Sequence, residues 1–377
     1  MLNFPNGVTE AIFLQKYWQQ QPLVLRQAFN DINELLSCED LLQLSYQEDV
    51  ESRLVIQDLH NDEYSLIHGP QSQTQLQQLE NQTHWTLLVQ SVNLWLPRIA
   101  HLSRHFEFIP QWRFDDIMLS YATDQGGVGP HTDEYDVFLL QISGKRRWLV
   151  GAPGSEVIAK TTSSGLCQVE SYKAEIDTVL DVGDMLYLPP GTAHNGIGVG
   201  TGMTLSVGFR SPNLSELSMI VAEQVSKHDK YYREPKTTQV QKHSLEISSE
   251  AMAKAADWYK AKLPESTIQV AFGLLQTQPK QELMLNPLYQ DISDYLSNST
   301  TLSKDPCARL AWWENEAVVH IFSNGEHYQD TVSIKPLLEF LEYTQDIDLN
   351  NFSTYIEDQD YSKLISFLVD TGYWGIK

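Results

Sequence analysis

Six short apolar segments between Phe114 and Phe209 limit the folds open to this chain more than any other feature. Each is rich in β-branched and aromatic residues and is bounded by Gly, Pro, Asp or Ser, which is typical of β-strands. No helical pattern separates them, so the strand-helix alternation of a parallel sheet is not indicated. We therefore expect an antiparallel barrel or a double-sheet roll. The segments are residues 114–123, 134–142, 145–151, 177–182, 184–190 and 203–209.

The length of 377 residues exceeds the roughly 100–200 residues of one ordinary domain, so two or three domains are expected. A hydrophobic content of 42% with 20% charged residues is that of a folded protein. The net charge of -23 argues against direct DNA binding, because affinity for phosphate needs clustered Lys and Arg. A basic protein partner fits better. The alternative is that the acidity only aids solubility.

The cysteine pattern and the N-terminus predict a protein of the cytoplasm. Cys38, Cys167 and Cys307 are far apart and form no Cys-x-x-Cys pair, which disfavours both a disulfide framework and a zinc ribbon. The N-terminus has no basic region followed by a long apolar run, and no later stretch reaches the roughly 20 apolar residues of a membrane span. We therefore expect a protein that is neither exported nor inserted in a membrane.

Helices are expected before the strand segments. Residues 9–20 carry apolar side chains at helical spacing after a Thr cap, and a short strand should follow Pro22. Residues 85–106 show the pattern of one long amphipathic helix. His101 and His105 lie one turn apart at its polar end and could hold a metal. Because no third ligand lies nearby, a solvated surface pair is the favoured interpretation.

A candidate metal site lies where the second strand segment begins. His131 and Asp133 are separated by one residue, so in an extended chain both side chains point to the same side and can reach one ion. His194 follows the rigid turn at residues 189–191 and would complete the set, although an ordinary tight turn is the alternative there. Two His and one carboxylate on one face of a metal is the arrangement of non-haem Fe(II) oxygenases.

Arg146 is the candidate for binding an anion beside that metal. A guanidinium grips a carboxylate at two points, so Arg146 could hold the carboxylate end of a small cosubstrate. The alternative is a solvent-facing basic cluster with Lys145 and Arg147. The alternation of side chains along a strand turns at most part of that cluster inward.

The pattern changes to helices after the last strand segment. Residues 214–228 and 249–262 are predicted helices with apolar side chains such as Met219, Ile220 and Trp258. These side chains could pack on the barrel or form a dimer interface. We favour a homodimer, since most soluble oligomers are symmetric and self-complementary.

Residues 276–377 are expected to form a third unit. A turn signal at residues 323–325 predicts a hairpin, and helices are expected at residues 283–296, 334–344 and 361–371. Helices with a two-stranded wing resemble a winged helix. From Gln276 onward, however, 6 Lys and Arg face 16 Asp and Glu, a difference of -10 that does not suit DNA. The unit is therefore interpreted as protein-facing or structural.

The sequence resembles the Jumonji-C family of Fe(II)- and 2-oxoglutarate-dependent oxygenases, and within it the ribosomal oxygenases. The likeness runs over almost the whole chain and rests on FLQKYWQQQPLVLRQAF, GGVGPHTDEYDVF, GKRRW, DMLYLPPGTAH, SVGFRSPN and TGYWG. It implies an α+β protein: a double-stranded β-helix of the cupin or Jumonji-C type, a helical dimerisation segment and a winged-helix-like C-terminal domain. These parts are expected at residues 1–210, 211–275 and 276–377.

The resemblance also implies roles for individual residues. The implied activity is hydroxylation of an arginine side chain in a basic large-subunit ribosomal protein, number sixteen of the bacterial family, with Fe(II), 2-oxoglutarate and O2. Two sets of positions match the family: His131, Asp133 and His194 as iron ligands, and Arg146, Ser120 and, less closely, Ser206 in the 2-oxoglutarate pocket.

An arginine substrate suits an acidic rim around such a site. A histidine hydroxylase of another ribosomal protein is an alternative activity. A non-enzymatic cupin that binds a metal or a small molecule, and an acidic interaction protein, are alternatives of other classes. The intact ligand set together with Arg146 argues against the non-enzymatic cupin. The candidate rim residues are Asp116, Asp124, Glu134 and Asp136.

Overall fold

The chain divides into two compact units, Met1–Ser211 and Pro212–Lys377. The predicted further division of the second unit at residue 276 stays a prediction. None of the described helices is long and apolar enough to cross a membrane. The computed structural model describes residues 2–30, 32, 35–60, 63–155, 157–160, 166–226, 231–233, 247–261, 263–285, 301–348 and 359–375.

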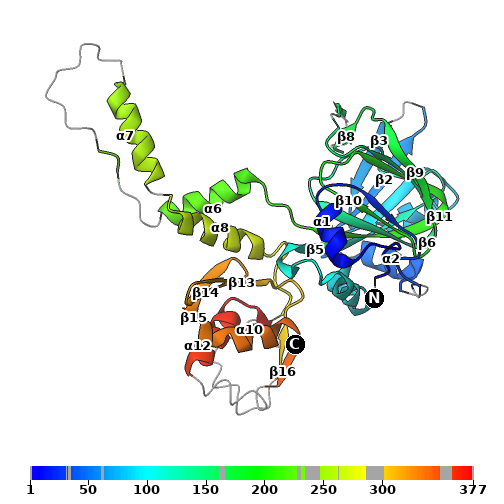
Figure 1. Cartoon of the computed structure of the whole chain (residues 1–377). Coiled ribbons are helices and arrows are strands. Elements are labelled where there is room, and N and C mark those ends of the chain that lie inside the picture. The colour runs from blue at the N-terminus through cyan, green and yellow to red at the C-terminus, as the bar shows by residue number, and fades with distance from the viewer. Residues whose placement is uncertain are drawn as a thin grey trace. The chain divides into compact units, whose positions relative to one another are not determined.

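The first unit is built around one antiparallel sheet that curves into a barrel, as the short strand segments predict (Figure 1). Its strands follow the order β1-β10-β6-β11-β5-β4-β2-β3, and β9 also pairs with β6. A two-stranded sheet, β7 (Ala159–Lys160) with β8 (Gln168–Val169), lies in the connection from β6 to β9. The bounds are β1 Leu23–Leu25, β2 Ser52–Asp58, β3 Glu63–His68, β4 Trp85–Val89, β5 Phe114–Ala122, β6 Asp136–Gly151, β9 Ala174–Leu180, β10 Met185–Leu188 and β11 His194–Phe209.

Two strands are longer than predicted. β6 continues through Gly144, where two separate strands were expected, and β11 already begins at His194. Their pairing shifts register between Val199 and Met203. Such irregularities bend a strand, so one strand can contribute to two parts of a barrel. His194 and the later part of β11 therefore belong to a single element.

The prediction of one long helix over residues 85–106 is wrong. Trp85–Val89 is the strand β4, whose five residues are all buried and pair with β2 and β5. Periodicity cannot distinguish a short, fully buried strand from a helix, and here the pairing partners decide. His105 packs edge-on against Phe29, and the described residues offer no metal-binding group that includes it.

Helices cover one face of the sheet. Thr9 caps the first helix, as predicted, by accepting a hydrogen bond from the Ile12 N–H. Phe13 of this helix is fully buried in the same cluster as Leu140 of β6, whereas the neighbouring Leu139 belongs to a separate cluster on the other face. The sheet thus has an outer, helix-covered core and a smaller inner core. The helices of this unit are α1 Glu10–Lys16, α2 Cys38–Ser45, α3 Gln73–Gln78, α4 Val92–Trp95 and α5 Pro97–Ala100, followed by the short 3-10 helix His101–Phe106.

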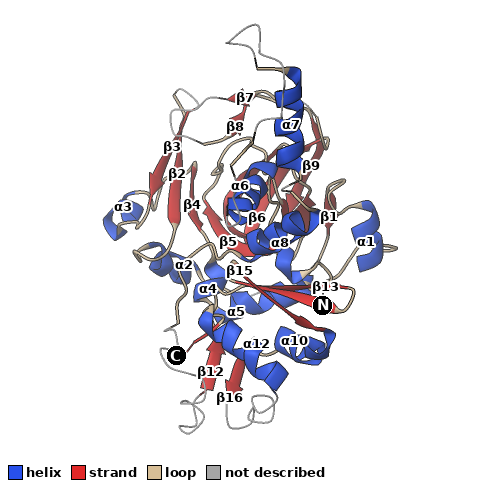
Figure 2. Cartoon of the chain, turned by 90° about the vertical axis from the view of Figure 1, so that its left-hand side faces the viewer, coloured by secondary structure: helices blue, strands red, loops and turns tan. Residues whose placement is uncertain are grey.

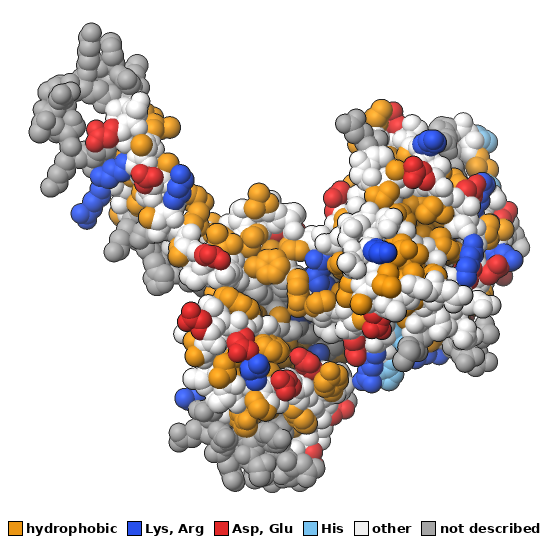
Figure 3. All heavy atoms as spheres, in the orientation of Figure 1, with side chains coloured by type: hydrophobic (Ala, Val, Ile, Leu, Met, Phe, Trp, Pro, Cys, Tyr) orange, Lys and Arg blue, Asp and Glu red, His pale blue; other side chains and the backbone are white. Residues whose placement is uncertain are grey.

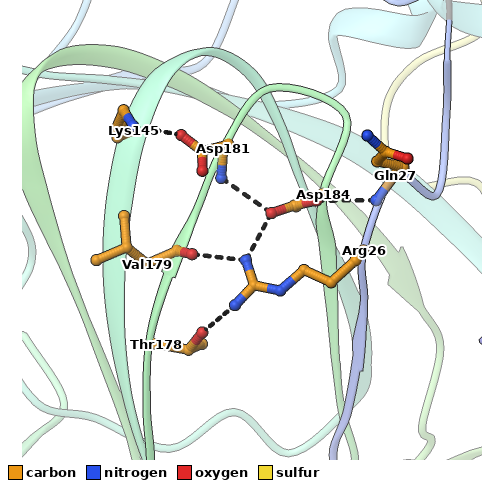
Figure 4. A network of polar contacts seen from close by, with 7 residues as sticks. All are labelled: Arg26, Gln27, Lys145, Thr178, Val179, Asp181 and Asp184. Atoms are coloured by element: carbon orange, nitrogen blue, oxygen red, sulfur yellow. Dashed lines mark hydrogen bonds and ion pairs between the residues drawn. The ribbon is translucent and has the colours of Figure 1, made fainter.

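A polar network links the residues directly after β1 to β9 and to the turn before β10 (Figure 4). The Arg26 guanidinium donates to the Val179 carbonyl oxygen (2.7 Å) and to Asp184 Oδ2 (2.6 Å). Asp184 also accepts from the backbone N–H groups of Gln27 (2.8 Å) and Asp181 (3.1 Å). Because its buried carboxylate is satisfied by these donors, Asp184 fixes the turn from which β10 leads toward His194.

The second unit has a helical part and a small sheet part (Figure 2). α6 Leu214–Ser226 packs against α8 Glu265–Thr277, while α7 Ser249–Lys260 has no buried residue. α8 lies against the sheet β13-β14-β15, where Gly273 allows close approach: a Cβ at this position would lie 2.4 Å from the Phe322 ring.

This sheet has three strands instead of the predicted two, and the predicted turn at residues 323–325 joins β14 to β15. The predicted helices at 334–344 and 361–371 are confirmed as α10 and α12. Most of the predicted helix 283–296 lies outside the described residues. The bounds are β12 Thr301–Lys304, β13 Leu310–Asn315, β14 Val318–Ser323, β15 Glu326–Thr331, the 3-10 helix Val332–Ile334, α10 Lys335–Glu342, β16 Asp346–Asp348, α12 Gln359–Asp370 and β17 Trp374–Gly375.

Candidate active site

Two reciprocal backbone hydrogen bonds bring His131 and His194 together. The His131 N–H donates to the His194 carbonyl oxygen (3.0 Å), and the His194 N–H donates to the His131 carbonyl oxygen (2.9 Å). In such an antiparallel bridge the two side chains stand on the same side, and the ring centroids are 4.2 Å apart. The structure therefore places the two predicted ligands side by side at the start of β11.

Both imidazole rings are held in the tautomer that suits a metal ligand. Nδ1 of His131 lies 2.9 Å from the Gly129 carbonyl oxygen, and Nδ1 of His194 lies 2.9 Å from the Thr192 carbonyl oxygen. Because a carbonyl only accepts hydrogen bonds, each Nδ1 carries the proton and each Nε2 keeps a free lone pair. Backbone carbonyls orient metal-bound histidines in this way.

Asp133 completes the group. Its Oδ2 lies 3.6 Å from Nε2 of His194 and 3.9 Å from Nε2 of His131. Two atoms bound to one ion at about 2.1 Å lie at most about 4.2 Å apart, so both distances fit a shared ion. The Asp133 carbonyl oxygen accepts from the Gly191 N–H (2.7 Å), which ties this loop to the turn before His194. Within the described part of the chain, no other group of three His, Cys, Asp or Glu side chains has metal-binding geometry.

Burial keeps His194 neutral. Burial, with a further contribution from His131, lowers the pKa of His194 to about 4, even though Asp133 opposes the shift. A metal binds the neutral imidazole, so at neutral pH His194 needs no deprotonation before it can act as a ligand.

Arg146 is a buried cation whose hydrogen-bond partners within the described residues are neutral. Its NH1 donates to Ser120 Oγ (3.2 Å) and its NH2 donates to the Gly196 carbonyl oxygen (3.2 Å), while Nε is buried without a hydrogen-bond partner. Burial lowers the pKa of Arg146, but only to about 10, so the group stays charged at neutral pH. Among the described residues no carboxylate forms an ion pair with it. A buried charge without a counter-ion is costly, so the pocket suits an anionic ligand.

The surroundings of Arg146 shape that pocket. The guanidinium carbon lies 5.1 Å from the centroid of the Trp148 ring. Gly196 leaves room for both side chains, since a Cβ there would lie 2.6 Å from atoms of each. Ser206 of β11 pairs with Met118 and shares a sheet face with Ser120, so both predicted serines lie on the side of the sheet that carries the site.

Asp116 is held in place by neutral donors. The side chain is 6% exposed, and its Oδ2 accepts from Gln90 Nε2 (2.6 Å) and Ser91 Oγ (2.8 Å). Gln90 in turn accepts from the Arg53 guanidinium (2.9 Å), which orients the amide with its NH2 group toward Asp116. Asp116 lies on the same face of β5 as Ser120. It is therefore a preorganised acceptor on the side of the sheet that carries the metal group.

The other three predicted rim residues differ in their surroundings. Asp136 is fully buried, where Tyr187, Gln19 and Arg113 donate to its carboxylate, so its prediction as a rim residue is wrong. A sequence pattern could not reveal these partners, which come from distant parts of the chain. Asp124 accepts from the Gly200 N–H (2.8 Å) in a turn, and Glu134 is exposed.

Tyr135 is a residue of this region that sequence reasoning missed. Its side chain is 42% exposed, and its pKa is raised by burial of the hydroxyl and by the nearby charges of Asp133 and Asp116. Tyr135 therefore lies near both Asp133 of the metal group and Asp116, a predicted contact for the substrate. The only signal in the sequence was an aromatic residue two positions after Asp133.

Comparison with known proteins agrees with this geometry. Residues 101–217 match the JmjC domain family. The chain is 34% identical to "Ribosomal protein uL16 3-hydroxylase" of Escherichia coli (strain K12), over 99% of this chain and 97% of that protein. It is 40% identical to "Probable ribosomal oxygenase" of Haemophilus influenzae, over 56% of this chain and 52% of that protein.

Solved structures give the same result over the whole chain. The X-ray structure of E. coli YcfD has a TM-score of 0.81 and 32% identity, with 100% of both chains covered. The structure of E. coli YcfD, described as a ribosomal oxygenase in complex with cobalt and 2-oxoglutarate, has a TM-score of 0.79 and 32% identity, again with 100% of both chains covered. The predicted fold class is confirmed, and the chain belongs to the JmjC-domain ribosomal oxygenases.

Proposed function

We propose that this protein hydroxylates an arginine side chain of the large-subunit ribosomal protein uL16, using Fe(II), 2-oxoglutarate and O2. The proposal rests on one observation above all: a two-His, one-carboxylate group in the same barrel as Arg146, a buried cation without an anionic partner among the described residues. The likeness to the E. coli uL16 3-hydroxylase supports the substrate, and the complex of YcfD with cobalt and 2-oxoglutarate supports the metal and the cosubstrate.

In this proposal His131, Asp133 and His194 hold Fe(II) and leave its remaining positions open. Arg146, with Ser120 beside it, binds the distal carboxylate of 2-oxoglutarate, and Ser206 is a further candidate contact. When bound, the metal and cosubstrate supply the oxidising chemistry: C–H, O2 and 2-oxoglutarate become C–OH, succinate and CO2. The protein binds and orients the reactants, so that only one carbon of the substrate lies close to the metal.

Asp116 and Tyr135 are the proposed contacts for the substrate arginine. Gln90 and Ser91 both donate to Oδ2 of Asp116. Its Oδ1 lies beside Gly208, where a Cβ would be 3.6 Å from that oxygen. A guanidinium can donate to Oδ1 and stack on the Tyr135 ring. Asp124 and Glu134 remain candidate rim residues.

The net charge of -23 suits a basic ribosomal protein as partner, since opposite charges steer encounter. Ribosomal proteins are made in the cytoplasm, and we propose that the enzyme acts there.

Asp116→Asn is expected to raise the KM for uL16 about 10- to 100-fold, because a hydrogen bond to a charged group is lost. The measurement is the rate at which purified uL16 gains the mass of one oxygen atom, followed at several uL16 concentrations. Tandem mass spectrometry should locate the oxygen on an arginine.

Asp177→Asn is the matched control, since it removes an exposed carboxylate of β9 that pairs with Arg147 and lies outside the candidate site. Its KM should change by less than about threefold. Modification of a histidine instead would favour the alternative activity, and unmodified uL16 with active enzyme would refute the substrate. Equal effects of the two variants would remove Asp116 from the substrate contacts.

We propose further that the region of residues 211–275 forms a homodimer interface. Hydrophobic side chains gather over α6 and α8 in the space-filling view (Figure 3). Met219 is 63% exposed and Met252 59%, while Ile268 and Phe272, one turn apart on α8, are 39% and 38% exposed. Exposed apolar surface of this kind marks an interaction site, and a second copy would cover it symmetrically.

Light scattering is therefore expected to give twice the 43.0 kDa chain mass for the wild type. Met252→Glu and Phe272→Glu should yield monomers, because each places a charge in an apolar interface. Val199→Glu, at an exposed apolar residue in the first unit, is the control and should leave the mass unchanged. A monomeric wild type would refute the dimer but not the metal site.

A further inference from the structure

We infer that Gln168 is a positioning residue for the metal ligand His131. The inference rests on the metal site of the proposed function and is independent of the protein substrate. Gln168 belongs to β8, in the connection between β6 and β9, far from the ligand in sequence. Its side chain is almost fully buried at 2% exposure, although it is polar.

The side chain and the backbone around Gln168 hold the loop before His131. Gln168 Nε2 donates to the Val128 carbonyl oxygen (2.6 Å). The Val169 N–H donates to the Pro130 carbonyl oxygen (2.9 Å), and Gln168 forms a β-bridge with His131. The loop is therefore held by hydrogen bonds on both sides of Gly129, at Val128 and at Pro130.

Gly129 connects these contacts to the metal ligand His131. Its φ of +81° is a backbone conformation that side chains rarely adopt, and a Cβ there would lie 2.2 Å from Gln168 Nε2 and 3.2 Å from Tyr64 Cζ. The amide of Gln168 therefore packs directly against Gly129 and occupies the space that a side chain there would need. The Gly129 carbonyl oxygen is the acceptor for the Nδ1–H of His131.

These contacts form a continuous path from Gln168 to the imidazole. The Gln168 amide holds the Val128–Gly129 peptide through its hydrogen bond to the Val128 carbonyl oxygen. This peptide positions Gly129 and hence its carbonyl oxygen. That oxygen accepts from Nδ1 of His131 and so fixes the tautomer and orientation of the ring. Without the amide donor the Val128–Gly129 peptide loses this hydrogen bond, and the Gly129 carbonyl is held less firmly. His131 then loses the alignment that keeps its Nε2 beside Asp133, and the metal site is less well preorganised.

Two near-isosteric substitutions test the amide donor. Gln168→Met removes the donor and nearly keeps the volume, whereas Gln168→Glu also places a carboxylate against the Val128 carbonyl oxygen. Changes around a metal-bound histidine typically lower metal affinity 10- to 100-fold, so we expect about 10-fold weaker Co(II) binding for Met and a larger loss for Glu. The measurement is anaerobic titration with Co(II), followed by visible absorbance, with thermal unfolding of each metal-free variant alongside.

Tyr172→Phe is the control, since Tyr172 belongs to the same connection and donates to the Leu149 carbonyl oxygen (2.7 Å). It should bind Co(II) as the wild type does. Wild-type affinity in both Gln168 variants, or an equal loss in Tyr172→Phe, would overturn the role of Gln168 and leave the metal site intact. A wild type that fails to bind Co(II) would overturn the metal site, and the inference with it.

Discussion

Asp133→Ala is expected to abolish turnover. The substitution leaves two histidines whose Nε2 atoms no longer share an anionic neighbour, so Fe(II) loses its carboxylate ligand and the charge that offsets its own. A metal contributes several kcal/mol to such a reaction, which corresponds to a rate loss of at least about 1000-fold. His131→Ala should have an effect of the same order. The visible band that Fe(II) and 2-oxoglutarate produce together in anaerobic protein should disappear in both variants.

Asp177→Asn provides the control for a lost carboxylate. Asp177 is an exposed residue of β9 that pairs with Arg147, and its replacement should leave both turnover and the visible band unchanged. Thermal unfolding should show that the barrel remains folded in all variants. Full activity of Asp133→Ala or His131→Ala would contradict the metal assignment.

Arg146→Lys is expected to raise the concentration of 2-oxoglutarate needed for half-maximal turnover about 10- to 100-fold. The charge remains, but the planar grip on a carboxylate and the donor to Ser120 are lost. Arg146→Met, which also removes the charge, should raise the required 2-oxoglutarate concentration further. Co(II) binding without cosubstrate should change little in either variant, since Arg146 is not a ligand.

The adjacent arginine offers a matched comparison. Arg147 is exposed and pairs with Asp177, because successive residues of β6 point to opposite faces. Arg147→Lys should therefore leave the requirement for 2-oxoglutarate unchanged. If Arg146→Lys behaved like Arg147→Lys, the distal carboxylate would have another anchor.

Local sequence patterns were sufficient for much of this protein. The strand segments predicted an antiparallel barrel because their length and bounding turns are local properties. His131 and Asp133 could be paired because one intervening residue places two side chains on the same side of an extended chain. The alternation along β6 also indicated that Arg146 and Arg147 would not share one environment, and the structure separates them in this way.

Other features depended on contacts between distant segments. Trp85–Val89 became a strand because β2 and β5 supply its pairing partners, and an apolar run alone does not contain that information. Asp136 is buried because its partners include Tyr187 and Gln19, more than 50 and 100 residues away along the chain.

The sequence by itself determined which residues can bind a metal, since ligand chemistry and the alternation of side chains in an extended segment are local. Only the tertiary structure decided what surrounds those residues. Gln168 reaches the His131 loop, and Gln90 reaches Asp116, from segments whose sequences show no sign of the contact. The physical reason is that a buried polar group must find its partner wherever the fold brings one close, and that proximity is a property of the packed chain.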